Sequence, residues 1–324
     1  IIYSVVHGYS TPDTVDLEIP LQLLPACMDG FRIILITDIH GGTITGRSEV
    51  VSLVDQANRL EGDAVFIVGD ISDGKVTDLE KTLEPLANIN APFGKAFVTG
   101  NHERYFDDPD NWKVFMQSKG YIVLTNEFIP FPQNSTCSID LVGLDDRDIG
   151  SDIDAAVHGR NSSRASILLA HQPIEFLTAA DHGIGLTLSG HTHGGHIFPI
   201  HPFVYLDQGS YVSGLFQRDG SLLYVSEGSM GWGPRTRLLS SREITRITLR
   251  SAKLYDLADK TIKAPYRSAQ QAAFAGFALL LLIAMFYVLT GPLKFIVGKF
   301  AIIEDRNSSQ SQQQKSLRGR DPSF

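Results

Sequence analysis

Carboxylate, imidazole and amide side chains recur in this sequence directly after short runs of apolar, β-branched residues. Such runs read as strands buried on both faces, and open α/β sheets bind their ligands outside the carboxyl ends of the strands. The side chains that follow five of these runs are Asp38 and His40, Asp70, Asn101 and His102, His171, and His191 and His193. One aspartate or histidine at a strand end usually caps a turn, but five strands that all end in this way predict a shared site.

The types of these side chains predict a metal centre. Carboxylates and imidazoles without thiolates suit borderline divalent cations such as Mn, Zn and Fe. Seven or so ligands exceed what one ion needs, so we expect two ions, with Asp70 as the natural bridge. Two ions about 3.5 to 4 Å apart can share a bridging hydroxide that attacks phosphorus while both screen the developing charge. The pattern therefore predicts a metal-dependent hydrolase of a phosphate ester, either a monoester or a diester, lipid-linked esters included.

The stretch "SGHTHGGH", residues 189–196, holds three of the ten histidines. Its glycines allow a sharp turn, so that His191 and His193 can both point at the cluster. We expect His196 to support another ligand or to lie on the surface.

Strand-like and helix-like stretches alternate along the chain, which predicts an α/β fold. The spacing of apolar residues predicts helices over Arg47–Leu60 and Asp78–Ile89. The later strands follow one another more closely, which suggests a mixed second sheet.

The ordered motifs "DIH", "GD", "GNHE", "H" and "GHTHGG" resemble the signature of the calcineurin-like metallophosphoesterases, over residues 31 to about 250. The later stretch "LYVSEGSMGWGPRTRLLSSREITRITL" resembles the end of the membrane-associated, YkuE-like branch, which includes animal transmembrane proteins with a metallophosphoesterase domain. The resemblance implies a four-layered α/β/β/α sandwich of two mixed sheets, with a dimetal site at the carboxyl ends of the strands.

The resemblance also implies a role for each ligand. Asp38, His40 and His193 would hold the first metal, Asp70 would bridge, and Asn101, His171 and His191 would hold the second. His102 would be catalytic from outside the ligand set, through proton transfer to the leaving group or stabilisation of transition-state charge. A histidine suits that task because its unperturbed pKa is about 6.5.

The segment "GDISDG" departs from many protein phosphatases of this superfamily, because Gly74 stands where they have arginine. This departure counts against a protein phosphatase and leaves the phosphate clamp to another residue. Arg235 or Arg237 in "GWGPRTR" is our candidate substrate-binding residue, and two surface charges on a turn are an equally open alternative.

Other functional classes fit the sequence less well. The segment "GDISDGKV" almost matches a P-loop, but Val76 lacks the hydroxyl that holds magnesium, and Asp70 and Asp73 would repel phosphates. No G-x-S-x-G motif of a serine hydrolase occurs in the chain. A non-catalytic, membrane-tethered metal-binding scaffold of the same fold remains the alternative, and loss of ligands would mark it.

Ala272–Leu289 reads "AAFAGFALLLLIAMFYVL", close to the roughly 20 apolar residues that cross a bilayer. A buried core helix would normally show a polar face, and none is evident here. We therefore expect a single membrane span. The expected division is an N-terminal extension at 1–30, a metallophosphoesterase domain at 31–250, a linker at 251–267, a transmembrane helix at 268–293 and a basic polar tail at 294–324.

The charge distribution makes nucleic acid an unexpected partner. Of 28 Lys/Arg and 36 Asp/Glu, the tail at 294–324 holds six and three, which leaves 22 basic and 33 acidic residues before it. The expected partners are a phosphate-ester substrate and a membrane, and the sequence does not indicate an oligomeric state.

We expect the catalytic domain to face the lumen or the cell exterior. Two glycosylation sequons, "NST" at Asn134 and "NSS" at Asn161, lie in polar, loop-like sequence before the span, although a third at Asn307 lies in the tail. The two cysteines, Cys27 and Cys137, are too few for a disulfide scaffold and indicate no compartment.

Overall fold

A computed structural model of the chain describes residues 11–195, 201–233, 237 and 240–252. The chain divides into two compact units, Ile1–Arg267 and Ser268–Phe324. Every described residue belongs to the first unit.

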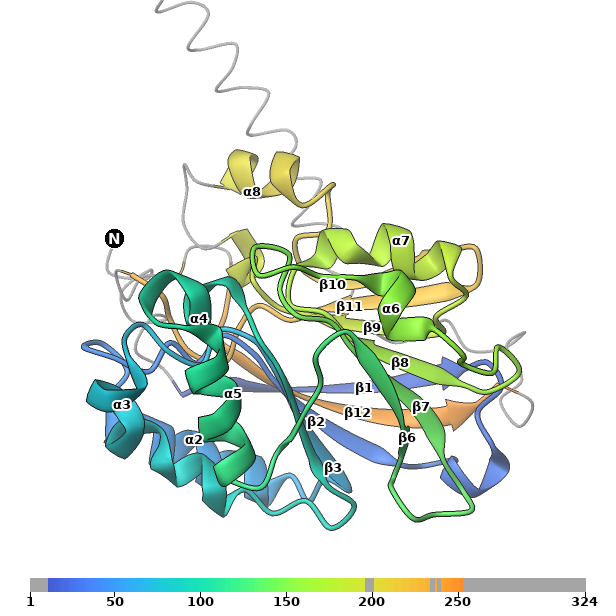
Figure 1. The fold of residues 1–324 in the computed structure, drawn as a ribbon, viewed down its shortest axis with the longest axis horizontal. Helices are drawn as coiled ribbons and strands as arrows, with labels where there is room; N and C mark the ends of the chain where they lie inside the picture. Colours follow the sequence, from blue (N-terminus) through green and yellow to red (C-terminus); the bar gives the residue numbers. More distant parts are fainter. Residues whose placement is uncertain (1–10, 196–200, 234–236, 238–239, 253–324) are drawn as a thin grey trace, which may run out of the picture. The chain divides into compact units, whose positions relative to one another are not determined.

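Two six-stranded sheets form the centre of this unit (Figure 1). The first sheet has the order β1 (Asp13–Leu21), β12 (Glu243–Ser251), β2 (Arg32–Ile36), β3 (Ala64–Val68), β4 (Lys95–Val98) and β5 (Ile122–Val123). The second has the order β10 (Gly214–Arg218), β11 (Ser221–Val225), β9 (Leu186–Ser189), β8 (Ser166–Leu169), β7 (Ile139–Gly143) and β6 (Glu127–Phe131). Each sheet combines parallel and antiparallel pairs, since β12 is antiparallel to β2 and β6 to β7. The expected α/β class with two mixed sheets is confirmed.

Helices cover the outer faces of both sheets (Figure 1). Those that follow strands of the first sheet are α2 (Arg47–Arg59), α3 (Val76–Leu83), α4 (Asn101–Phe106) and α5 (Pro109–Ser118). Those that follow strands of the second sheet are α6 (Ile153–Val157), α7 (Phe176–Asp181) and α8 (His201–Asp207). Short 3-10 turns are η1 (Ala26–Met28), η2 (Glu84–Asn88), η3 (Pro173–Glu175) and η4 (His193–Gly195).

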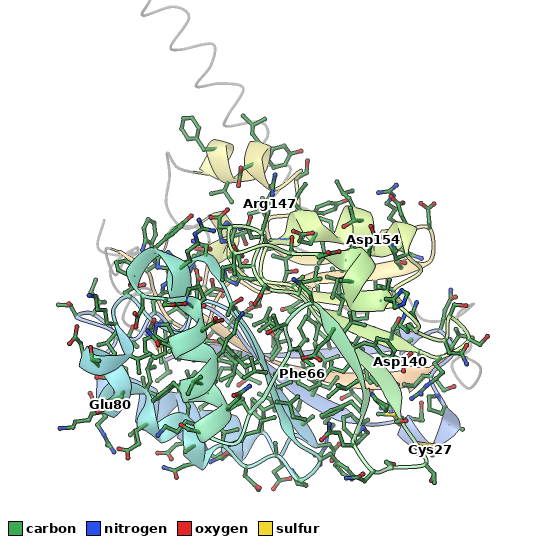
Figure 2. The ribbon with its side chains drawn as sticks, viewed as in Figure 1. Cys27, Phe66, Glu80, Asp140, Arg147 and Asp154 are labelled. Atoms are coloured by element: carbon green, nitrogen blue, oxygen red, sulfur yellow. A yellow bond between two sulfur atoms is a disulfide. The ribbon has the colours of Figure 1, made fainter. Side chains whose placement is uncertain are left out.

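Alternate side chains of the central strands enter different cores, which explains why these strands are apolar throughout. In β2, Ile33 and Leu35 pack between the two sheets, whereas Ile34 and Ile36 pack beneath α2 and α5. Phe66 of β3 lies in the core between the sheets, at the centre of Figure 2. The outer face of the second sheet packs against α6 and α7.

The helix expected over Asp78–Ile89 is divided in the structure. α3 ends at Leu83, and the chain continues as the 3-10 turn η2 with Pro85 near its start. Proline has no N–H to donate to the preceding turn of an α-helix, so the α-helical hydrogen bonds end before it.

The expected boundary at residue 31 is wrong, because the first sheet includes β1. This strand pairs in parallel with β12, from Asp13 opposite Glu243 to Leu21 opposite Ser251. Its alternating residues Leu17, Ile19 and Leu21 are buried between the sheets. The domain therefore begins by Asp13, and its last strand ends at Ser251, which we had placed in the linker.

Cys27 and Cys137 form a disulfide, although they are 110 residues apart in the sequence. Cys27 lies in η1, which follows the first sheet's edge strand, and Cys137 lies in the loop between β6 and β7 of the second sheet. The bond therefore links the two sheets covalently, and it adds a constraint that the sequence analysis did not assign.

Within the described part of the chain, no helix is long and apolar enough to cross a bilayer. The expected span at 268–293 and the expected tail at 294–324 lie outside the described residues.

Candidate metal centre

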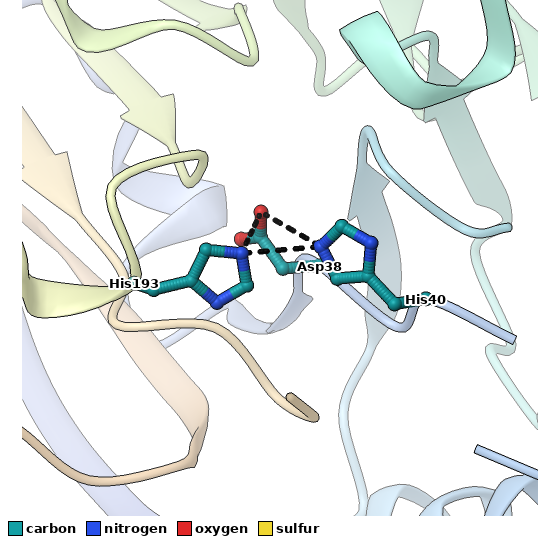
Figure 3. Close-up of side chains that lie close together, drawn as sticks. All are labelled: Asp38, His40 and His193. Atoms are coloured by element: carbon teal, nitrogen blue, oxygen red, sulfur yellow. Dashed lines mark hydrogen bonds and ion pairs between the residues drawn. The ribbon is translucent and has the colours of Figure 1, made fainter. Parts of the chain in front are cut away.

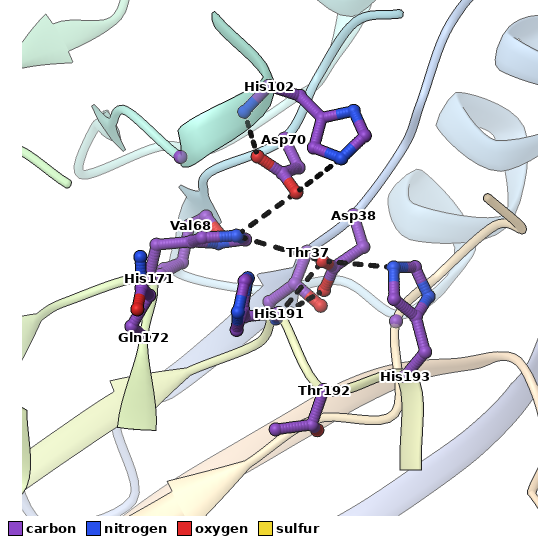
Figure 4. A network of polar contacts seen from close by, with 12 residues as sticks. Thr37, Asp38, Val68, Asp70, His102, His171, Gln172, His191, Thr192 and His193 are labelled. Atoms are coloured by element: carbon purple, nitrogen blue, oxygen red, sulfur yellow. Dashed lines mark hydrogen bonds and ion pairs between the residues drawn. The ribbon is translucent and has the colours of Figure 1, made fainter. Parts of the chain in front are cut away.

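The carboxyl ends of strands from both sheets bring expected ligands to one place, where Figure 4 labels Asp38, Asp70, His171, His191 and His193. Each strand is followed by its ligands: β2 by Asp38 and His40, β3 by Asp70, β4 by Asn101 and His102, β8 by His171, and β9 by His191 and His193. Three sets of three potential ligands form there among the described residues, each with ligand atoms within 4.8 Å of one another, and two of these sets consist only of expected ligands.

The first set consists of Asp38, His40 and His193 (Figure 3). The Asp38 Oδ1 atom lies 3.6 Å from His193 Nε2 and 3.9 Å from His40 Nε2. The two Nε2 atoms lie 3.1 Å apart. All three residues are buried, so the set is shielded from bulk water.

The second set consists of Asp70, His171 and His191. The Asp70 Oδ2 atom lies 3.1 Å from His171 Nε2, and it also lies 3.8 Å from His40 Nε2 of the first set. Asp70 thus reaches both sets through one oxygen atom, which is the position a bridging ligand requires.

Two buried polar atoms of the described site have no hydrogen-bond partner: Asn101 Oδ1 and His171 Nε2. The other nitrogen of His171, Nδ1, donates to the carbonyl of Val68 at 3.0 Å, so Nε2, which lies 3.1 Å from Asp70 Oδ2, is the nitrogen that can bind a cation once it is deprotonated. An unsatisfied buried acceptor costs about 1 to 3 kcal/mol, and a cation would satisfy both atoms. The oxygen and nitrogen donors therefore fit a divalent metal ion.

Asp73 is a site residue that the sequence analysis did not assign. Its Oδ1 accepts hydrogen bonds from His40 Nδ1 at 2.8 Å and from His102 Nδ1 at 2.7 Å. Potential ligand atoms of His40, Asp73 and His102 also lie within 4.8 Å of one another, and these hydrogen bonds explain that proximity without a metal ion. Its signal in the sequence was the second aspartate of "GDISDG".

Glu103, in the motif "GNHE", supports the site from beneath the ligands. It is fully buried, and its carboxylate accepts from the backbone N–H groups of Asp70 at 3.0 Å, Ile71 at 2.8 Å and Gly100 at 2.6 Å. Burial and the nearby charge of Asp70 raise the pKa of Glu103 to about 8. Glu103 therefore holds the backbone that carries Asp70.

The backbone at the ligands is strained. Asp38, His40, Asp70, His191 and His193 all have φ between 47° and 68°, a region that non-glycine residues rarely adopt. Gly190 permits the close approach of two ligand loops, because a Cβ there would collide with the Asp38 carboxylate. Strain concentrated at one cluster is typical of functional sites.

The charges of the site stabilise one another across both sets. Burial opposes ionisation of Asp70, but the neighbouring histidines, His171 foremost, outweigh it and lower the pKa of Asp70. Burial raises the pKa of Asp38. Burial and the charge of His171 lower the pKa of His191 to about 4, which keeps that imidazole neutral and able to bind a cation.

His102 lies beside the two sets. Its Nε2 is 3.9 Å from Asp70 Oδ2, and its backbone N–H donates to Asp70 Oδ1 at 2.9 Å. Burial lowers the pKa of His102, but the hydrogen bond to Asp73 and the charge of Asp70 outweigh burial and raise that pKa overall.

Arg237, one of the two expected phosphate clamps, is 1% exposed. Its guanidinium donates to the carbonyls of His193, Glu227 and Met230. It also donates to His193 Nδ1 at 3.0 Å. Because a guanidinium only donates, His193 carries its ring proton on Nε2, and cation binding there has to displace it. Arg235 and His196 lie outside the described residues.

Comparisons with known proteins show the family of the chain. The sequence profile of the calcineurin-like phosphoesterases matches residues 31–195. A transmembrane protein with metallophosphoesterase domain from Danio rerio is 35% identical over 264 residues, which cover 78% of this chain and 60% of that protein. The uncharacterised metallophosphoesterase YkuE of Bacillus subtilis is 31% identical over 245 residues, which cover 74% of this chain and 86% of YkuE.

A solved dimetal phosphatase from Danio rerio superposes with a TM-score of 0.42 at 14% identity, covering 68% of this chain and 99% of that chain. The present chain spans about 60% of the length of the animal relatives it matches. From the matched profile and these relatives, the chain belongs to the calcineurin-like phosphoesterase family.

Proposed function

We propose that this protein hydrolyses a phosphate ester with two divalent metal ions. The observation that carries this proposal is the position of Asp70, whose Oδ2 reaches both His171 of one ligand set and His40 of the other. Asp38, His40 and His193 would hold one ion, and Asn101, His171 and His191 the other. Bound there, the ions would supply Lewis acidity and a lowered pKa for the attacking water.

His102 is positioned to act on the leaving group. Asp73 holds its Nδ1, which leaves Nε2 directed toward the space beside Asp70. The hydrogen bond to Asp73 and the charge of Asp70 raise the pKa of His102 and so stabilise its protonated ring, from which Nε2 can donate a proton as the ester bond breaks.

Arg237 acts as a positioning residue in this proposal. Its guanidinium donates to the backbone carbonyl of His193, so it holds the loop that carries this candidate metal ligand. Its burial and its carbonyl partners argue against the clamp role that we expected for it. A phosphate clamp at Arg235 stays a prediction.

The alternative is a metal-binding scaffold of the same fold without catalysis. Loss of a ligand or of the proton donor would favour it. Two clusters of candidate ligands lie together in the described site with His102 beside them, and this arrangement supports hydrolysis over a scaffold role.

Phosphate release by the purified full chain tests the proposal. With added Mn²⁺, we expect turnover of mono- or diesters that stops when the metal is chelated and resumes when it is restored. Asp70→Asn should abolish turnover, whereas Asp55→Asn, at an exposed position of α2, should leave it unchanged. Metal binding without turnover of any ester in a broad screen would favour the scaffold instead.

We further propose that the catalytic domain lies in an oxidising compartment, the lumen or the cell exterior, with residues 268–293 as its single membrane span. The disulfide supports this location because such bonds persist mainly outside the cytosol. Asn134 and Asn161 are both exposed in the structure, as glycan acceptors must be.

Protease treatment of sealed microsomes tests this orientation. The domain should be protected until detergent is added, and Asn134→Gln and Asn161→Gln should each remove one endoglycosidase-sensitive increment of mass. Digestion of an unglycosylated domain without detergent would place it in the cytosol.

A further inference from the structure

Most of the large exposed apolar side chains lie on segments that also carry, or contact, residues of the candidate site. Seven of the ten in the described part of the chain either follow a ligand closely in the sequence or contact His102: Ile44, Tyr105, Phe106, Phe203, Tyr205, Leu206 and Trp232. The other three, Leu23, Phe93 and Val114, lie elsewhere in the fold. Single exposed apolar residues need no explanation, but a concentration at one functional edge indicates recognition.

The helix α8 carries three of these exposed side chains. Phe203 is 71% exposed, Tyr205 44% and Leu206 77%. The helix packs against η4, the turn that begins with the ligand His193. The apolar surface of α8 is therefore attached directly to a metal-ligand loop.

Three further aromatic side chains surround the expected proton donor. The His102 ring centroid lies 5.6 Å from that of Tyr105, 5.4 Å from Phe106 and 5.7 Å from Trp232. These three side chains are 59%, 41% and 41% exposed, respectively. A leaving group that receives a proton from His102 would thus enter or leave along apolar surface.

We propose that the substrate is an amphiphilic phosphate ester whose hydrocarbon chain lies on the apolar side chains of α8 while its phosphate occupies the metal centre. This inference rests on the proposed function and specifies its substrate class. A nucleotide or sugar phosphate would leave Phe203 and Leu206 in water. A hydrocarbon chain would cover them. Each methylene group buried in this way would strengthen binding by about 0.8 kcal/mol.

The apolar run Ala272–Leu289 of the same chain favours a lipid as the occupant. A chain that carries a membrane span keeps its catalytic domain near a bilayer, where amphiphilic esters are concentrated. Neither a second protein nor a second copy of the chain is needed to cover α8 in this account.

The test compares esters that differ only in chain length, with the full chain in detergent and Mn²⁺. The pairs are p-nitrophenyl methyl and p-nitrophenyl octyl phosphate for a diesterase, and butyl and dodecyl phosphate for a monoesterase. We expect kcat/KM to be at least tenfold higher for the longer member, mainly through KM, because burial of only about two methylene groups gives this factor.

Matched variants assign the preference to α8. Phe203→Ser/Leu206→Ser should reduce the long-to-short ratio of kcat/KM at least fivefold. Leu23→Ser, a leucine that is 52% exposed and follows β1, should leave the ratio as in the unmodified chain. Equal losses for long and short esters, or no dependence on chain length, would overturn the inference.

A binding measurement that does not depend on turnover distinguishes failure of this inference from failure of the proposed function. Trp232 contacts His102, whereas Trp112, the other tryptophan, is fully buried, so quenching by a brominated dodecyl phosphate reports on the rim of the site. If no ester is hydrolysed but quenching still depends on Phe203 and Leu206, the proposed hydrolysis fails and the apolar recognition stands. If the only effect of Phe203→Ser/Leu206→Ser is loss of a dimer, the α8 surface binds a second copy and the inference is wrong.

Discussion

Asp73 holds two histidines, His40 and His102, through one oxygen atom. Its removal should therefore weaken metal binding and lower turnover together. In Asp73→Ala, His40 and His102 each lose a hydrogen bond to a carboxylate, of 2.8 and 2.7 Å. Hydrogen bonds to charged groups contribute about 1.5 to 3 kcal/mol each. Loss of the group that orients a metal-bound histidine typically lowers metal affinity 10- to 100-fold.

The catalytic loss should be seen even when metal is saturating. Without Asp73, His102 loses both its orientation and the cause of its raised pKa, so we expect kcat to fall about 10²- to 10³-fold within the range of general acid catalysis. Steady-state kinetics over a Mn²⁺ titration measures both effects. Asp55→Ala, on the exposed surface of α2, is the control and should change neither.

A double-mutant cycle decides whether Asp73 acts through His102. At saturating Mn²⁺, Asp73→Ala/His102→Ala should be little slower than His102→Ala alone, because both changes remove the same proton donor. If the fold decreases in kcat of the two single variants multiply in the double variant, Asp73 does not act through His102. A kcat of Asp73→Ala close to that of Asp55→Ala would refute the reasoning as well.

Three other predictions follow from the described contacts. His102→Ala should lower turnover about 10²- to 10⁴-fold with metal content kept, and less for good leaving groups such as nitrophenol; equal losses for good and poor leaving groups would contradict the acid role. The raised pKa of His102 keeps its acid form to higher pH, so Asp73→Asn should move the alkaline limb of kcat/KM to lower pH, and an unmoved limb would assign it to another group. Cys27→Ser/Cys137→Ser should lower the free energy of unfolding by up to about 4 to 5 kcal/mol for a loop of this length, measured in urea; reduction should destabilise only the unmodified chain.

The ligands could be predicted from the sequence because each lies within a few residues of a strand end. Strand ends are local features, and Asp38, Asp70 and His171 each follow an apolar run that is buried in the structure. The carboxyl ends of these strands converge on one edge, so the predicted ligand sets meet there.

Contacts between distant segments could not be predicted in this way. β1 pairs with a strand more than 200 residues away, and the Cys27–Cys137 bond closes a separation of 110 residues. Arg237 was recognised as important only for its charge. Its burial against His193 depends on how two loops pack, which no local pattern encodes.

Metal content of the purified full chain tests the central claim most directly. After saturation with Mn²⁺ and removal of free metal, elemental analysis should find two ions per chain. His193→Ala should retain one of them, and Asp70→Asn should weaken both because it removes the shared charge. At most one ion in the unmodified chain, or full occupancy in Asp70→Asn, would contradict a dinuclear centre bridged by Asp70.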